Sequence, residues 1–157
     1  MKITLAVVGR MNNGYLSKGV EDYTSRLNHY VPFSILHVPD VKNARSLTQE
    51  QQKEAEGRNL LAAIDNADHV VLLDERGTQF TSVDFAKTIE KKMAGGMKRL
   101  LFVVGGPYGF SRQVYDRAND KISLSRMTFS HEMVRLVFVE QLYRAMTILR
   151  NEPYHHE

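Results

Sequence analysis

The sequence predicts an α/β domain whose sheet is mostly parallel and covered by helices on both faces. Short apolar runs alternate with helix-like stretches along the whole chain. These runs are continuously apolar instead of alternating with polar residues, which is typical of strands buried on both faces. The 157 residues, of which 43% are hydrophobic, suit one domain with a core of its own. We therefore expect a single domain over residues 1–157.

The first half of the chain predicts three strands and two helices. Each strand candidate is a short apolar run closed by glycine, proline or aspartate. The first helix has one apolar face, because Leu16, Val20, Tyr23, Leu27 and Tyr30 follow one another at steps of four and three residues. In chain order we expect a strand at 3–9, this helix, a strand at 33–38, a polar connection at 40–48, a helix from 49 to 64 and a strand at 70–74.

The second half continues the alternation towards the carboxy terminus. Thr81 and Asp84 have the spacing of a capping box at the start of a helix. Ser130 is placed to cap the last helix, and Glu132 sits favourably against that helix's dipole. In chain order we expect a helix after Thr81, a strand at 100–104, a short helix from Ser111, a strand at 122–125 and the last helix.

Composition excludes several classes of site. The chain has no cysteine, which excludes disulfides, thiolate nucleophiles and cysteine metal sites and fits a reducing compartment. The longest apolar runs are too short to span a membrane, and the chain begins with a strand-like run instead of a signal sequence. We therefore expect a cytoplasmic protein with no membrane partner.

Charge is distributed unevenly between the two halves. Residues 1–80 hold nine Lys and Arg against ten Asp and Glu, and residues 81–157 hold twelve against eight, so the halves carry −1 and +4. A basic excess attracts phosphates, although the overall +3 is ordinary for a soluble protein.

A glycine-rich turn follows the expected strand at 100–104. Gly105, Gly106 and Gly109 surround Pro107 and Tyr108, which matches neither the G-x-G-x-x-G dinucleotide fingerprint nor the lysine-containing phosphate loop. Glycines allow backbone to come close to another group. The turn is therefore either a tight strand-to-helix connection or a ligand loop, and LSRMTF at 124–129 is likewise either a plain strand end or part of a site.

The last helix and the tail carry the remaining candidates. His131 with Arg135 and Glu140 with Arg144 are four residues apart, a spacing that ordinarily gives surface pairs. The helix is apolar around most of its circumference, so we expect it to be covered, in part by another subunit. A free tail is ordinarily disordered, and its adjacent histidines lack a third ligand at suitable spacing, so we expect no metal.

Read in order, GGPYG, LSRMTF, SHEMVRLVFVEQLYRA and NEPYHHE resemble the ribosomal RNA large subunit methyltransferase H family. These are small SPOUT methyltransferases, and the resemblance covers the whole chain, including MKITLAVVG and LLDERG. It implies a homodimer, a deep carboxy-terminal trefoil knot and S-adenosylmethionine bound in that knot. By matched position it implies these cofactor residues: Leu73, Gly105, Leu124, Ser125, Arg126, Met127, Thr128 and Phe129.

The resemblance also implies methylation of N3 of a pseudouridine in the helix 69 loop of 23S ribosomal RNA, on the assembled ribosome. Such a transfer needs alignment and removal of a proton, without a metal. We hypothesise that Arg144, Tyr154 and His155 complete the site across the dimer, and that His131 and Arg135 contact RNA or organise the knot.

Two alternatives stay open. The fold also suits a non-catalytic RNA-binding or ribosome-assembly module, or a nucleotide-binding protein with another ligand. The tail departs from the family where His156 stands in place of a frequent arginine.

Overall fold

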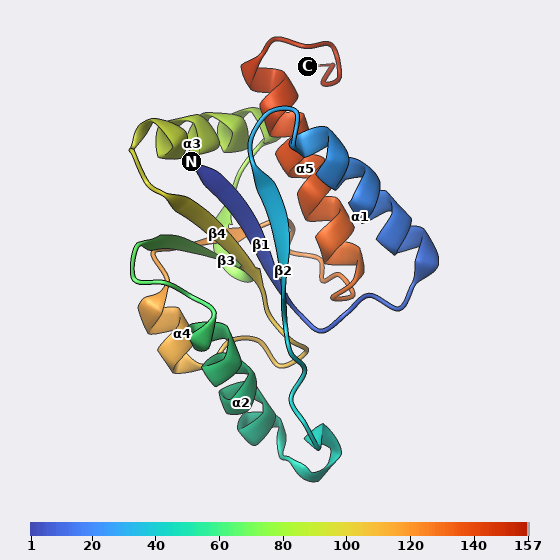
Figure 1. The fold of residues 1–157 in the computed structure, drawn as a ribbon, viewed down its shortest axis with the longest axis vertical. Helices are drawn as coiled ribbons and strands as arrows, with labels where there is room; N and C mark the ends of the chain where they lie inside the picture. Colours follow the sequence, from blue (N-terminus) through green and yellow to red (C-terminus); the bar gives the residue numbers. More distant parts are fainter. Residues whose placement is uncertain (157) are drawn as a thin grey trace.

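A computed structural model describes residues 1–156, which form a five-stranded sheet in the order β2-β1-β4-β3-β5 with every pair parallel (Figure 1). The α/β fold with a parallel sheet is thus confirmed. The strands are β1 (Lys2–Val8), β2 (Phe33–Val38), β3 (Asp68–Gln79), β4 (Arg99–Val104) and β5 (Asp120–Ser123). The helices are α1 (Gly14–Leu27), α2 (Gln49–Ala62), α3 (Ser82–Ala94), α4 (Arg112–Arg117) and α5 (Met133–Leu149), with a short 3-10 turn at Ala44–Ser46.

The helices cover both faces of the sheet in separate layers. Helices α1, α3 and α5 pack on one face, and α2 and α4 pack on the other. Strand β4 shows why a continuous apolar run is needed, since Leu100 and Phe102 face the first layer while Leu101 and Val103 face the second. All four side chains are at most 1% exposed.

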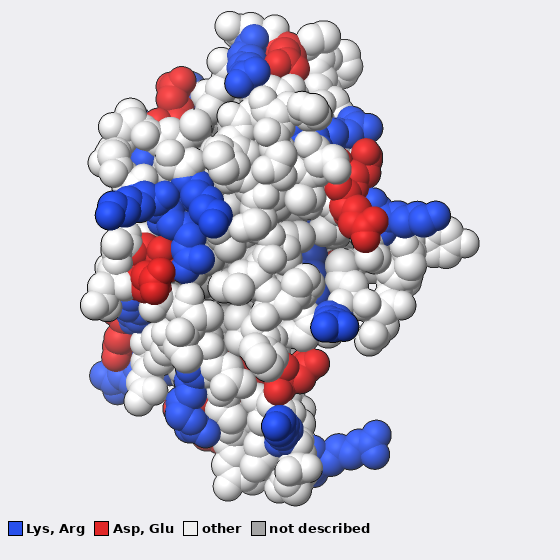
Figure 2. Space-filling view, viewed as in Figure 1, with Lys and Arg blue, Asp and Glu red and all other residues white. Residues whose placement is uncertain are grey.

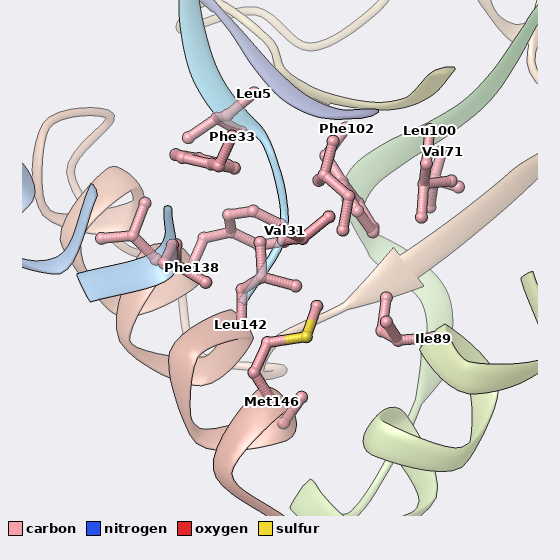
Figure 3. Close-up of a cluster of buried hydrophobic side chains, with 14 of the residues drawn as sticks. Leu5, Val31, Phe33, Val71, Ile89, Leu100, Phe102, Phe138, Leu142 and Met146 are labelled. Atoms are coloured by element: carbon pink, nitrogen blue, oxygen red, sulfur yellow. The ribbon is translucent and has the colours of Figure 1, made fainter. Parts of the chain in front are cut away.

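Helix α5 is the centre of the larger core. Phe138, Leu142 and Met146 point from it towards the sheet, where Phe102 and Leu100 meet them (Figure 3). The rings of Phe102 and Phe138 lie 4.7 Å apart between centroids. Because α5 also packs against α1 and α3, most of its apolar circumference is covered within the chain.

Strand β3 runs farther than the apolar run at 70–74 predicts, because it continues beyond a bulge. Both Leu73 and Thr78 pair with Ile122 of β5, so the four residues between them are pushed out of the ladder. A side chain at Gly77 would lie 2.6 Å from backbone atoms of Ile122, so only glycine allows this approach. The bulge places residues 74–77 beside the carboxyl end of the sheet.

The predicted helix starts hold in part. Thr48 and Gln51 form a complete capping box on α2, whereas at Thr81 the side chain accepts from the Asp84 N–H without the reciprocal bond. Ser130 Oγ accepts from the Met133 N–H at 3.2 Å, so it does serve the start of α5.

Glu132 departs from its expected role at the start of α5. Its carboxylate accepts the backbone N–H groups of Asn12 at 2.5 Å and Asn13 at 3.3 Å, in the loop between β1 and α1. These bonds to Asn12 and Asn13 hold the pKa of Glu132 below its usual value, against the smaller effect of burial. The first turn of α5 is therefore fastened to the amino-terminal loop.

Candidate functional site

A cavity of about 900 Å³ lies at the carboxyl ends of β3, β4 and β5. Open parallel sheets bind their ligands at this edge. Leu73, Val104, Leu124 and Val134 give it apolar walls, and polar side chains including Asp74 border it.

The glycine turn lines this cavity and is also a tight turn, so the two interpretations of GGPYG are compatible. Gly109 has a φ of 80° and donates its N–H to the Gly106 carbonyl at 3.2 Å. A Cβ at Gly105 would lie 3.0 Å from the Phe110 ring. The turn therefore presents backbone, with no side chains on Gly105 or Gly106, to the cavity.

The segment after β5 forms the opposite wall. Ser123 Oγ donates to the Ser125 carbonyl, and Ser125 Oγ accepts from the Met127 N–H, both at 2.9 Å, so two serines shape this turn. Seven of the eight predicted cofactor residues border the cavity: Leu73, Gly105, Leu124, Ser125, Met127, Thr128 and Phe129. Arg126 is exposed and does not border it.

A hydrogen bond that the sequence did not reveal closes one side of the cavity. The Tyr115 hydroxyl donates to Asp74, and both residues border the space. Burial and the bond to Asp74 raise the pKa of Tyr115 to about 12, so the phenol stays protonated as the donor. Asp74 directly follows the apolar run of β3, a position that could have drawn attention to it, whereas Tyr115 in a short helix gave no signal.

His131 and Arg135 differ in placement, although the same role was expected of both. His131 is exposed and borders the cavity. Arg135 is only 2% exposed and donates to the carbonyls of Val8 at 2.8 Å and Gly9 at 3.2 Å. The donors of Arg135 are thus used inside the protein, and its contact with RNA stays a prediction. These bonds join α5 to the end of β1.

Arg144, Tyr154 and His155 lie together, but they do not border the cavity of their own chain. Arg144 bonds Glu140 at 2.6 Å and His155 Nδ1 at 3.0 Å, and its guanidinium stands 4.9 Å from the centroid of the Tyr154 ring. The pairing with Glu140 is thus real and coexists with the contacts to the tail. Along α5, Arg144 is ten residues beyond Val134 of the cavity, which corresponds to about 15 Å.

The tail is ordered by a cluster that we term the tyrosine clamp, made of Tyr23, Tyr30, Tyr143 and Tyr154. The hydroxyls of Tyr23 and Tyr154 lie 3.1 Å apart, and Tyr30 donates to Glu152 at 2.6 Å. Burial and the bond to Tyr23 raise the pKa of Tyr154. The clamp therefore holds the tail against α1 and α5.

Within residues 1–156, no group of three or more His, Asp or Glu side chains is arranged to hold a metal ion. In the same part of the chain, no helix combines the length and apolar character that a membrane span requires.

Comparisons with known proteins identify the family of this chain. A family model described as "Predicted SPOUT methyltransferase" matches residues 1–155. Proteins described as ribosomal RNA large subunit methyltransferase H are 57% identical in Parabacteroides distasonis, 54% in Porphyromonas gingivalis and 52% in Flavobacterium johnsoniae, each over 157 residues and all of both chains. The chain therefore belongs to the SPOUT methyltransferase family.

Proposed function

We propose that this chain is an S-adenosylmethionine-dependent methyltransferase of 23S ribosomal RNA, with the cavity as its cofactor site. The observation that carries the proposal is that the turn after β4, the segment after β5 and the end of β3 converge on one cavity. The relatives' descriptions name ribosomal RNA of the large subunit as the substrate of those proteins.

The residues of the cavity fit this cofactor. A volume of about 900 Å³ lies within the range of small-molecule sites. Leu73, Leu124 and Val134 can enclose an adenine ring, and the backbone of Gly105 and Gly106 can approach it without side chains in the way. When bound, S-adenosylmethionine supplies a methyl group on a positively charged sulfur, ready for direct displacement. The chain then has only to align the acceptor and help remove its proton.

We infer that a second copy of the chain completes the site. Arg144, Tyr154 and His155 are positioned as a group by α5 and the tyrosine clamp, yet none of them borders the cavity of its own chain, and Arg144 stands about 15 Å along the helix from it. In a homodimer with two-fold symmetry, each tail can serve the cavity of its partner. The trefoil knot belongs to the same proposal, supported by the family and by a chain that returns from edge strand β5 to a helix packed against both α1 and α3.

The proposed acceptor is N3 of a pseudouridine in the helix 69 loop, on the assembled ribosome. His131, exposed at the rim of the cavity, is placed to meet RNA. Figure 2 shows basic and acidic side chains interspersed over one face, with the largest basic group at its left edge. We propose that recognition draws on both subunits and on the ribosomal surface around the target.

The first prediction tests the catalytic group. Replacing Arg144 by Ala, and separately removing residues from Tyr154 onward, is expected to abolish methylation of 23S RNA while S-adenosylmethionine still binds. The guanidinium and the tail hold the reacting groups in place, whereas the cavity that takes the cofactor is unchanged. Mass spectrometry of 23S RNA from cells lacking the gene and carrying each variant measures activity, and calorimetry measures binding.

Arg45→Ala, an exposed position in the connection before α2, is the matched control. Full methylation by either test variant contradicts the catalytic assignment. Absence of S-adenosylmethionine binding by the unaltered protein contradicts the proposed function as a whole, and binding without methylation of 23S RNA favours the non-catalytic RNA-binding module instead.

A further inference from the structure

Glu56 is a buried carboxyl that no described part of the chain neutralises. Glu56 is 5% exposed. Its Oε1 has no hydrogen-bond partner, and its Oε2 accepts one hydrogen bond, from Gln52 Nε2 at 3.4 Å. Lys53, one turn earlier on α2, pairs with Glu50 at 2.9 Å. Within residues 1–156, no cation lies within ion-pair distance of Glu56.

The carboxyl stands directly behind the glycine turn of the cavity. A Cβ at Gly106 would lie 2.3 Å from Oε1 and 2.5 Å from Oε2 of Glu56. Gly106 itself borders the cavity, as does Lys53 on the same helix as Glu56. The backbone of one glycine therefore stands between the carboxyl and the cavity, and the residue at 106 must be glycine for the two to be this close.

Such a carboxyl is sensitive to any positive charge that enters the cavity. Burial raises the pKa of Glu56, the nearby Asp40 acts in the same direction, and Gln52 and His131 act against them. A buried carboxylate without a cation is unfavourable, and an approaching cation relieves this cost in a medium of low dielectric constant. A neutral ligand of the same shape gives no such relief.

Resting on the proposed function, we propose that Glu56 is a specificity-determining residue that favours the positively charged cofactor over its spent form. Methyl transfer breaks the carbon–sulfur bond, gives the methyl group to the acceptor nitrogen and leaves the electron pair on sulfur. S-adenosylhomocysteine has therefore lost the one positive charge that distinguished the sulfur of S-adenosylmethionine. The carboxyl behind Gly106 stabilises the first ligand more than the second, which favours exchange of product for fresh cofactor.

The test compares both ligands on three variants by calorimetry. Glu56→Gln keeps the shape and removes the charge, so it is expected to weaken S-adenosylmethionine about tenfold and S-adenosylhomocysteine less than about twofold. Glu56→Asp keeps the charge farther back and is expected to retain part of the preference. Glu54→Gln, on the same helix, is the matched control and is expected to leave both affinities unchanged.

Three results overturn the inference. Equal weakening of both ligands in Glu56→Gln means that the side chain only shapes the turn. Unchanged affinity for both ligands in Glu56→Gln means that the charge of the carboxyl does not affect binding in the cavity. Equal ligand affinities in Glu56→Asp and Glu56→Gln mean that the charge does not determine the preference. In each case the unaltered protein still binds S-adenosylmethionine, so the proposed function stands; loss of that binding in the unaltered protein is the separate result that overturns both.

Discussion

At the scale of single residues, Asp68 and Arg99 make the most buried ion pair among the described residues. Asp68 of β3 is 7% exposed and accepts from Arg99 Nε at 2.8 Å and from the terminal guanidinium at 2.5 Å. Burial acts to raise the pKa of Asp68, but Arg99 and the Asp65 N–H outweigh it and hold the pKa below its ordinary value. The pair joins the first residues of β3 and β4, at the end of the sheet away from the cavity.

This pair predicts a specific loss of stability in acid. Because the folded-state pKa of Asp68 lies below its unfolded value, its contribution is complete above roughly pH 5 and is lost as the pH falls through the unfolded-state and then the folded-state pKa. Asp68→Asn is expected to lower the free energy of unfolding at pH 7 by about 3 kcal/mol and to flatten its decline between about pH 5 and pH 3. Urea unfolding across this range measures both effects.

Asp116→Asn serves as the control, because its carboxylate is exposed and its ion pair with the exposed Arg112 is long, at 4.0 Å. If the free energy of unfolding falls as steeply with acid in Asp68→Asn as in the unaltered protein, Asp68 is not the source of the acid sensitivity.

Single residues also show where sequence reasoning stops. The spacing of His131 and Arg135 predicts a surface pair, yet Arg135 is buried, bonds only the backbone carbonyl of His131, and donates its other bonds to the carbonyls of Val8 and Gly9, more than a hundred residues earlier. The same holds for Glu56, whose importance depends on contact with Gly106 across the domain. Spacing within a helix describes neighbours on that helix and carries no information about distant backbone.

At the scale of elements, continuous apolar runs located the strands well and their ends less well. The run at 100–104 became β4 with one residue added, because burial on both faces leaves little choice. Strand β3 ran on to Gln79 because of its second pairing with β5, which no local pattern encodes. The walls of the cavity could be anticipated because each is one short segment of the sequence, whereas the Asp74–Tyr115 bond joins two elements.

The tyrosine clamp yields a prediction for α1 and the tail. Tyr30→Phe removes the hydroxyl that donates to Glu152 at 2.6 Å, a bond to a charged group worth roughly 1.5–3 kcal/mol. We expect faster hydrogen exchange in residues 150–156 and a several-fold lower methylation rate, with unchanged affinity for S-adenosylmethionine. Mass-spectrometric hydrogen exchange and single-turnover methylation measure the two effects.

Tyr15→Phe is the control, since Tyr15 is 91% exposed and has no part in the clamp. Unaltered exchange of the tail in Tyr30→Phe would show that the clamp does not hold it. Faster exchange with an undiminished rate would show that order in the tail is irrelevant to the reaction.

At the scale of the whole molecule, the cavity is separated from Arg144 and the tail, and the proposed homodimer would therefore make activity a property of two chains. Two variants with different defects provide the test. Ser125→Arg places a long cationic side chain in the cavity and is expected to prevent cofactor binding. Arg144→Ala is expected to bind cofactor and fail in the reaction. Each alone is inactive, because every site in its homodimer lacks one part.

Mixed in equal amounts and allowed to exchange subunits, the two variants are expected to recover about one quarter of normal activity. Half of the dimers are then mixed, and each holds one site made of an intact cavity and an intact tail. Measured methylation of ribosomes and sedimentation of the mixture provide the rate and the assembly state. If mixed dimers are shown to form and no methylation activity is recovered, each cavity works with the tail of its own chain.

The tyrosine clamp also gives this protein an intrinsic fluorescence probe. The chain has no tryptophan and seven tyrosines, so its ultraviolet emission comes from tyrosine alone. Four of those seven belong to the clamp, where the ring centroids of Tyr143 and Tyr154 lie 4.8 Å apart. Movement of the tail changes the surroundings of a large share of the emitting rings. Fluorescence therefore reports tail docking in the unlabelled protein, in real time, as cofactor is added.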